Sequence, residues 1–249
     1  MRFLCPNCDR EETILLDRNP LCLFCRVEML PASDYSGRWM SPFIVIRRMV
    51  TIRETYGIKL AHTDRRLKKE REAFATGLLA LGISKLTGKQ LWVEIETVES
   101  TPDTRLRRLE QSSGHNTVQT RPVEVVDWEE NVDDVMKVIR KKCGRAYPGD
   151  YLLLVHARHV GKLIDFNRII EEMKTIRSPF LEVWVVAFVG QDDVKVVRVS
   201  PGDLGTDLKL GAELEKASAQ APFMKPRMRG TGTELEDLGL LFLPIPQLD

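Results

Sequence analysis

The sequence predicts an α/β protein in which helices cover both faces of a mixed β-sheet, preceded by a small N-terminal metal-binding module. Nearly continuous apolar segments, such as 151–156 and 181–189, alternate with amphipathic segments of helical period. Strands that are apolar on both sides are typical of sheets buried between two helix layers. Four cysteines lie close to the N-terminus, and the chain of 249 residues is long enough for one full core and a small appendage.

The N-terminal cysteines form two C-x-x-C motifs, composed of Cys5, Cys8, Cys22 and Cys25. Two residues between thiolates allow a tight turn to direct both sulfurs at one ion, and four thiolates satisfy tetrahedral Zn²⁺ with no open position. We therefore expect a structural zinc ribbon over 1–32. Two local disulfides, or four unrelated small apolar residues, are the alternatives.

The compartment follows from the same cysteines and from hydropathy. No apolar stretch approaches the length of a membrane span, and no signal-peptide core precedes the first cysteine. We expect a cytoplasmic protein with no membrane partner, in which paired thiols favour metal over disulfides. The fifth cysteine, Cys143, is expected to be a packed helix residue.

The net charge of +1 conceals a basic stretch between 36 and 72, which contains ten basic residues and only four acidic ones. Such a stretch is either a solvated helix face or a contact for a polyanion. If it binds a polyanion, nucleic acid is the expected partner. The residues that we expect to contact its phosphates are Arg65, Arg66, Lys68 and Lys69.

Segment 33–62 is predicted to be a basic linker, and its residues 41–56 are compatible with either helix or strand. The main domain is predicted over 63–200. Its first helix begins at Asp64 and ends at Gly82, because apolar residues recur between them at spacings of three and four. Strands are then predicted over 90–98, 105–109 and 117–128, with a hairpin turn at 112–116 between the last two.

The second half of the main domain continues the alternation. A helix is predicted from Asn131 or Asp133 to Cys143, where Gly144 ends it. There follow a buried strand over 151–156, a helix over 165–176, a buried strand over 181–189 and an edge strand over 194–199. The C-terminal extension, 201–249, is less regular and includes a basic segment over 221–230 that we expect to be a mobile loop.

Two short motifs give this element order a possible function. Thr101-Pro102-Asp103 stands where one strand gives way to the next, and Val123-Glu124-Val125-Val126-Asp127-Trp128 lies on the strand after the hairpin. Together with Glu72 on the first helix, they resemble the PD-(D/E)XK, or restriction-endonuclease-like, nuclease superfamily over about residues 64 to 200. The resemblance implies a restriction-endonuclease-like mixed sheet flanked by helices, and a Mg²⁺- or Mn²⁺-dependent nuclease.

In a site of this kind, Asp103 and Glu124 would hold the metal as hard oxygen ligands on neighbouring strands, and Glu72 would be a further ligand or an outer partner. The superfamily pattern usually places a lysine two residues after the strand glutamate, on the same face of the sheet. Val126 occupies that position. Lys141 and Lys142, on the following helix, are the candidates for a relocated lysine; the alternative is that they only interact with the helix dipole.

We therefore expect a Mg²⁺-dependent endonuclease that hydrolyses phosphodiester bonds, most plausibly in DNA. The structural alternative is that Asp103 is a turn residue after proline and that Glu124 faces solvent. The functional alternatives are a catalytically inactive nuclease-like module that binds nucleic acid, and a zinc-ribbon adaptor that binds protein. The sequence carries no G-x-S-x-G, Walker or G-x-G-x-x-G motif that would support other enzyme classes.

Overall fold

A computed structural model of the chain describes residues 2–4, 11–13, 30–31, 39–95, 102–112, 115–129, 132, 134–158, 164–190 and 192–219. In the N-terminal module, β1 (Arg2–Leu4) pairs with β2 (Glu11–Thr13) and with β3 (Leu30–Pro31), both antiparallel. The four cysteines of the predicted zinc ribbon lie outside the described residues. Zinc binding therefore stays a prediction.

The main sheet has eight strands in the order β11-β10-β9-β8-β7-β6-β5-β4. The pairs β7·β8 and β8·β9 are parallel and all other neighbours are antiparallel, so the sheet is mixed, as predicted. The strands are β4 (Trp39–Met40), β5 (Leu91–Ile95), β6 (Thr104–Ser112), β7 (His115–Trp128), β8 (Leu152–Ala157), β9 (Glu182–Phe188), β10 (Asp193–Ser200) and β11 (Leu204–Lys209).

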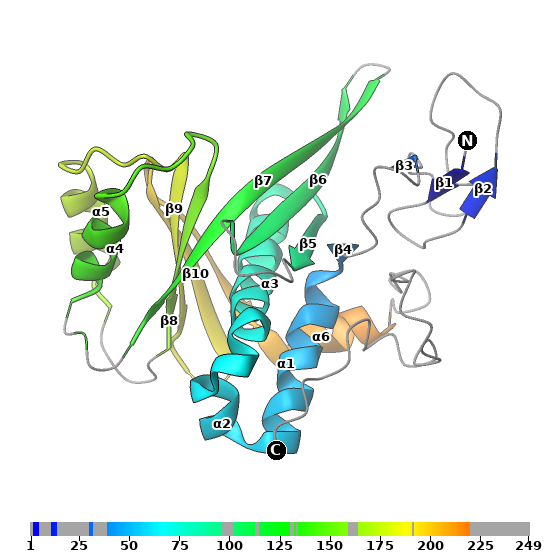
Figure 1. Cartoon of the computed structure of the whole chain (residues 1–249), viewed down its shortest axis with the longest axis horizontal. Helices are drawn as coiled ribbons and strands as arrows, with labels where there is room; N and C mark the ends of the chain where they lie inside the picture. The colour runs from blue at the N-terminus through cyan, green and yellow to red at the C-terminus, as the bar shows by residue number, and fades with distance from the viewer. Residues whose placement is uncertain are drawn as a thin grey trace.

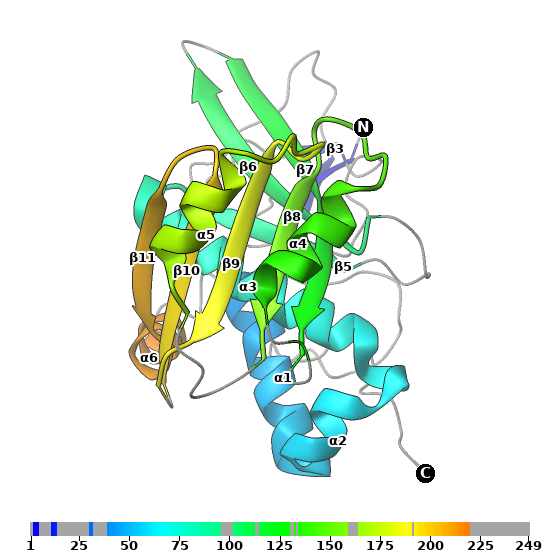
Figure 2. The same ribbon diagram turned by 90° about the vertical axis from the view of Figure 1, so that its left-hand side faces the viewer.

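Helices cover both faces of this sheet, as Figures 1 and 2 show. One face carries the long helix α3 with α1 beside it, and the other carries α4 and α5. The helices are α1 (Pro42–Tyr56), α2 (Ile58–Thr63), the short 3₁₀ helix η1 (Arg65–Leu67), α3 (Lys68–Thr87), α4 (Val135–Cys143), α5 (Phe166–Met173) and α6 (Leu210–Ala219).

The central strands divide their side chains between two cores. In β8, Leu152 and Leu154 pack on the α3 side, whereas Leu153 and Val155 pack on the α4 side. All six residues of β8 are buried. This division explains the continuous apolar runs in the sequence, since successive strand residues point to opposite faces and here both faces are covered.

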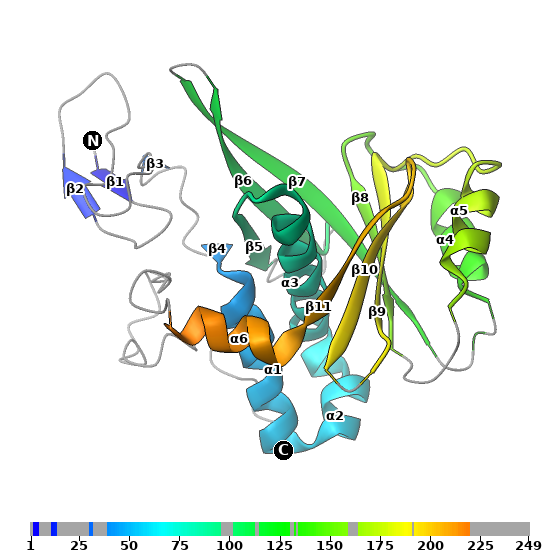
Figure 3. The same ribbon diagram turned by 180° about the vertical axis from the view of Figure 1, so that it is seen from behind.

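Helix α3 lies at the centre of the larger core. The sheet curls around this helix, so α3 contacts every strand from β5 to β11 (Figure 3). The predicted end of this helix at Gly82 was wrong, because α3 continues to Thr87 and ends at Gly88, which has a φ of 68°. At Gly82, an added Cβ would lie 2.6 Å from a methyl carbon of Val196. Gly82 thus allows close packing of helix on sheet.

Helix α1 belongs to this core, although the sequence suggested a linker over 33–62. Its Ile46, Met49 and Ile52 are fully buried, and they pack in the same cluster as the apolar face of α3. Arg48 is also buried and forms an ion pair of 2.6 Å with Glu70 of α3. Part of the basic stretch is therefore internal and cannot contact a partner.

The opposite helix layer begins with capping residues close to the predicted positions. Asp134, next to the predicted Asp133, caps α4 by accepting a hydrogen bond from the Met136 N–H, and Gly144 follows the helix as expected. Asp165 caps α5 through the Arg168 N–H. Cys143 at the end of α4 is a free, half-buried thiol that packs against this layer.

The C-terminal part of the described chain adds two elements that the sequence analysis did not predict. Strand β11 pairs with β10, so β10 is internal and not the expected edge strand. Helix α6 follows and is attached to α1 by a hydrogen bond of 3.0 Å from Arg47 Nη2 to the Leu214 carbonyl. Figure 3 shows α6 beside α1, on the side of α1 that faces away from the viewer in Figure 1.

The order of elements from α3 to β8 is helix, three strands, helix and strand, with β6 and β7 antiparallel, which confirms the predicted order. Among the described residues, no helix has both the length and the apolar character needed to cross a membrane.

Candidate active site

The carboxylate of Asp103 is fixed at the point where β6 meets β7. The Asp103 N–H donates to the Val123 carbonyl over 3.1 Å, and Asp103 Oδ2 accepts from the Val125 N–H over 2.9 Å. These two bonds flank Glu124 on the neighbouring strand. Asp103 is therefore a positioned side chain bonded to β7, and its other oxygen, Oδ1, is available for a further contact.

The first turn of α3 supplies that contact. Lys69 Nζ lies 2.9 Å from Glu72 Oε2 and 3.6 Å from Asp103 Oδ1, so one ammonium group stands between two carboxylates. Lys68 Nζ approaches the other oxygen of Glu72 at 3.4 Å. The side chain of Glu72 is only 7% exposed, so the charges interact with little screening by water. The structure thus brings Glu72 and Asp103 together around Lys69.

Glu72 is held in an environment that opposes its charge. Burial raises its pKa, the nearby charge of Asp103 raises it further, and Lys69 acts in the opposite direction. Lys69 Nζ and Glu72 Oε2 are both buried, and their contact lacks the geometry of a hydrogen bond. The carboxylates of Glu72 and Asp103, one of whose oxygens (Glu72 Oε2) accepts no hydrogen bond, supply oxygen ligands of the kind that suits a hard divalent cation.

Glu124 has a different set of partners. By the alternation of β7, its neighbours Val123 and Val125 face α3, and Glu124 points to the α4 side. There Lys142 Nζ forms an ion pair with Glu124 Oε1, and the Tyr147 hydroxyl donates to the same oxygen over 3.0 Å. Its side chain is 9% exposed, so the solvent-facing alternative for this residue is not what the structure shows.

The Tyr147 hydroxyl remains protonated in this setting. Burial raises its pKa, and the negative charge of Glu124 raises it further. Tyr147 therefore acts as a hydrogen-bond donor to the glutamate at neutral pH.

The two candidate lysines have separate roles. Lys142, in the last turn of α4, reaches Glu124, whereas Lys141 is exposed and forms no ion pair with any residue that the structure describes. Val126, at the position where the superfamily pattern has lysine, packs against the α4 core. The only cation that the described residues bring to the strand glutamate thus comes from the following helix.

The acidic residues do not converge on one point. Within the described part of the chain, no group of three or more acidic, histidine or cysteine side chains is arranged to hold a metal ion. Glu72 and Asp103 share Lys69, while Glu124 is engaged by Lys142 and Tyr147. The site consists of two lysine–carboxylate clusters, one on each side of the start of the β6·β7 ladder.

The predicted nucleic-acid contacts separate in the same way. Arg65 is exposed, and the side chains of Arg66 and Lys68 are 46% and 51% exposed. Arg66 also forms an ion pair of 2.9 Å with Asp64. In contrast, Lys69 is turned towards the carboxylates. We define the exposed basic patch as Arg65, Arg66 and Lys68.

Comparison with known proteins adds no assignment to this geometry. No protein-family model matches the chain, and no curated protein or solved structure is significantly similar to it.

The structure also reveals polar residues that the sequence analysis did not select. Tyr147 is one, and a cluster around Asp127 is another. Asp127 contacts His156 Nδ1 at 3.1 Å and Arg158 Nη1 at 3.1 Å. Burial disfavours its charge, but the bond from His156 and the positive charges around it lower its pKa overall. Period-2 alternation from Val125 would have placed Asp127 on the α3 side, but no local motif identifies its partners.

Proposed function

We propose that this protein is a metal-dependent nuclease of the restriction-endonuclease-like type that hydrolyses phosphodiester bonds in DNA. The observation that supports this proposal is the contact of Lys142 with Glu124, beside the β7-bonded carboxylate of Asp103. A lysine that served only the helix dipole would have no need of a buried carboxylate on the neighbouring strand. Lys142 would supply the positive charge that the superfamily pattern takes from a lysine at position 126, where this chain has valine.

The chain's own residues can perform the tasks that this reaction requires. When bound, a divalent cation would neutralise charge on the phosphate and activate water. Asp103 and Glu72 would hold it from the Lys69 side, and Glu124 lies on the neighbouring strand with Lys142. Lys142 would place a positive charge next to the reacting phosphate, and the Tyr147 hydroxyl orients the glutamate that Lys142 contacts.

Substrate binding is assigned to the basic patch. Arg65 and Arg66 lie in η1 and Lys68 begins α3, all within four residues of Lys69. They would neutralise backbone phosphates without reading the sequence of bases. A structural zinc ion at the four N-terminal cysteines is part of the same proposal.

A second function has one observation in its favour. Both lysines already neutralise the carboxylates, and the described residues form no three-ligand metal group. A module that binds nucleic acid without cleaving it would have this arrangement. The two functions differ in whether a metal ion produces cleavage.

The deciding experiment measures cleavage of labelled single- and double-stranded DNA and RNA with Mg²⁺ or Mn²⁺. Asp103→Asn and Glu124→Gln should each lower the rate about a hundredfold or more, because a metal ligand contributes several kcal/mol to the transition state. Both keep side-chain shape, and Asp103→Asn retains an oxygen for the Val125 N–H.

Glu171→Gln provides the matched control, since that carboxylate is 69% exposed and lies on α5. Cleavage by this variant should equal that of the wild type. Absence of cleavage with either metal on every substrate would leave the binding module as the function. Cleavage that persists in Asp103→Asn would instead discredit the site.

A further inference from the structure

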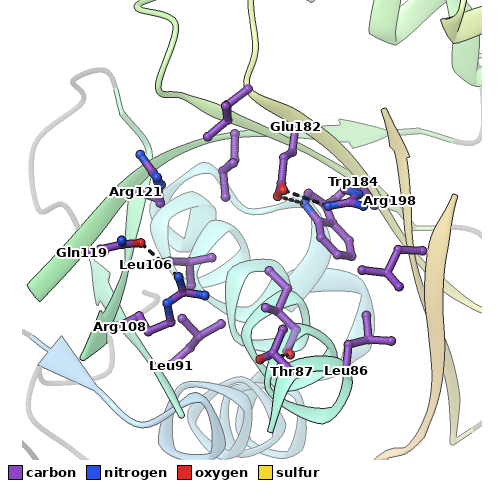
Figure 4. Close-up of a pocket in the computed structure, with 14 residues that line it drawn as sticks. Leu86, Thr87, Leu91, Leu106, Arg108, Gln119, Arg121, Glu182, Trp184 and Arg198 are labelled. Carbon is purple, nitrogen blue, oxygen red and sulfur yellow. Dashed lines mark hydrogen bonds and ion pairs between the residues drawn. The ribbon is translucent and has the colours of Figure 1, made fainter. Parts of the chain in front are cut away.

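A pocket of about 290 Å³ opens beyond the C-terminal end of α3, where the curled sheet extends past the helix (Figure 4). It is separate from the carboxylate site. Lys69 and Leu86 are at opposite ends of α3, which corresponds to about 25 Å at the rise of an α-helix. The carboxylate site therefore does not account for this pocket.

The wall and floor of the pocket are apolar. Leu86 of α3, Leu91 of β5, Leu106 of β6 and Trp184 of β9 line it. Side chains from the helix and from strands at both sides of the sheet thus surround one space. Its volume is near the lower end of the range for small-molecule sites, which are mostly apolar with a few placed polar groups.

The polar groups of the pocket form two sets that face each other in Figure 4. On the β9 and β10 side, Glu182 accepts hydrogen bonds from Trp184 Nε1 over 2.8 Å and from Arg198 Nη1 over 3.1 Å. The charge of that arginine is therefore balanced, and the carboxylate is fully engaged. This side of the pocket is close to neutral.

The β6 and β7 side is positively charged. Arg108 Nη2 donates to the Gln119 side-chain carbonyl over 3.1 Å. Arg121, two residues along β7, has no hydrogen bond or ion pair with any residue that the structure describes. Three arginines thus line the pocket with a single carboxylate among its lining residues. An anionic group is the complement that Arg121 lacks among the described residues.

We propose that this pocket binds a small organic anion, with one carboxylate or phosphate on an apolar or aromatic body. The anionic group lies against Arg121 and Arg108. The body lies against Leu91, Leu106 and the face of the pocket formed by Trp184. Guanidinium groups pair with carboxylate and phosphate through the same two-pronged geometry, so the shared chemistry defines the ligand class. The proposal is independent of nuclease activity.

The test uses the full chain and a fluorescent probe, 1-anilinonaphthalene-8-sulfonate, which combines one anionic group with an aromatic body. We expect saturable binding of one probe per chain. The neutral analogue N-phenyl-1-naphthylamine should bind about tenfold more weakly, as should the anionic probe to Arg121→Gln, since one charge-assisted hydrogen bond is lost. The neutral analogue should bind Arg121→Gln and wild type equally. Equal binding of both probes to the wild type would overturn the proposal.

Two further variants separate ligand binding from folding. Thr87→Phe adds bulk at an exposed position on the pocket wall, and it should abolish binding of both probes while the melting temperature is retained. Lys137→Gln, on α4 at the opposite face of the sheet, removes an exposed positive charge and should leave binding unchanged. Probe affinity that is unaffected by both Arg121→Gln and Thr87→Phe would contradict the assignment.

Competition identifies the source of the anion. Displacement of the bound probe by hexanoate indicates a carboxylate ligand, and displacement by phenyl phosphate indicates a phosphate ligand. Displacement by neither compound would contradict the proposed ligand class.

Discussion

The two lysine–carboxylate clusters use the same chemistry but are built in different ways. Lys69 and Glu72 are three residues apart on α3, so the helix itself brings them together, and Asp103 joins them from the position just before β6. Lys142 and Glu124 are 18 residues apart and meet only because α4 packs against β7. A lysine–glutamate pair three residues apart forms in many helices. The Lys142–Glu124 pair forms only in this fold, so it is the stronger indication of a functional role.

The clusters also differ in electrostatic balance. Around Lys69, two carboxylates share one buried ammonium, and the pKa of Glu72 is raised as a result of burial and of the charge of Asp103. Around Glu124, one carboxylate has both an ammonium and a hydroxyl donor. Among its buried groups, the first cluster has two carboxylates and one ammonium, because Lys68, which also reaches Glu72, is half exposed. The glutamate of the second cluster is already satisfied. We therefore assign metal binding mainly to the first and phosphate stabilisation to the second.

Among the variants that test this difference between the clusters, we expect the largest loss of cleavage rate for Lys142→Ala. Lys142→Ala should lower the single-turnover cleavage rate about a hundredfold, because a positioned cation near the transition state is removed. Lys141→Ala is the matched control, since that side chain is exposed on the same helix turn. It should cleave at the wild-type rate. Equal losses in the two variants would show that only general charge near the end of α4 matters.

A smaller effect distinguishes Lys69 from its exposed neighbours. Replacing Arg65, Arg66 and Lys68 together with glutamine should weaken DNA binding, and it should reduce the slope of log affinity against log salt by about three, one for each lost phosphate contact. Lys69→Gln should leave that slope unchanged while lowering cleavage, because Lys69 faces carboxylates and not solvent. Titration of labelled duplex DNA at several salt concentrations measures both.

An unchanged salt slope in the triple variant would remove the basic patch from the binding site. Folding should be little affected, because these side chains are exposed and surface ion pairs such as that of Arg66 with Asp64 contribute at most about 1 kcal/mol. Thermal denaturation of the triple variant checks this point.

The smallest effect concerns the pH dependence of stability. The pKa of Glu72 is raised above 4.5 in the folded state. Its contribution to stability is therefore fully present below pH 4.5, and it is lost as the pH rises through the folded-state pKa. Glu72→Gln removes this loss, so its melting temperature should fall less than that of the wild type between pH 4.5 and pH 7.

The control for this measurement is Glu171→Gln, whose carboxylate is 69% exposed on α5. Its melting curve should follow that of the wild type across the same pH range. Parallel curves for Glu72→Gln and the wild type would mean that Asp103 and burial do not perturb Glu72.

Much of the fold was predictable because its patterns are local. Continuous apolar runs indicated β8 and β9, and caps and periodicity indicated α3, α4 and α5 to within a few residues. Features that depend on long-range packing were missed. Helix α1 is buried against α3, Gly82 continues a helix because it faces Val196, and β11 covers the predicted edge at β10. In each case a distant neighbour, and not the local sequence, determined the outcome.

By itself, the sequence determined the alternation of strands and helices. It placed Asp103 between two strands and Glu124 on the strand after the hairpin. Hydrophobic period and turn residues act over a few positions and can be read locally. Only the tertiary structure decided that Lys142 and not Lys141 contacts Glu124. It also decided that Lys69, unlike its exposed basic neighbours, contacts Asp103. Consecutive helix residues point about 100° apart, so the rotation at which a helix packs selects which of two adjacent lysines enters a site.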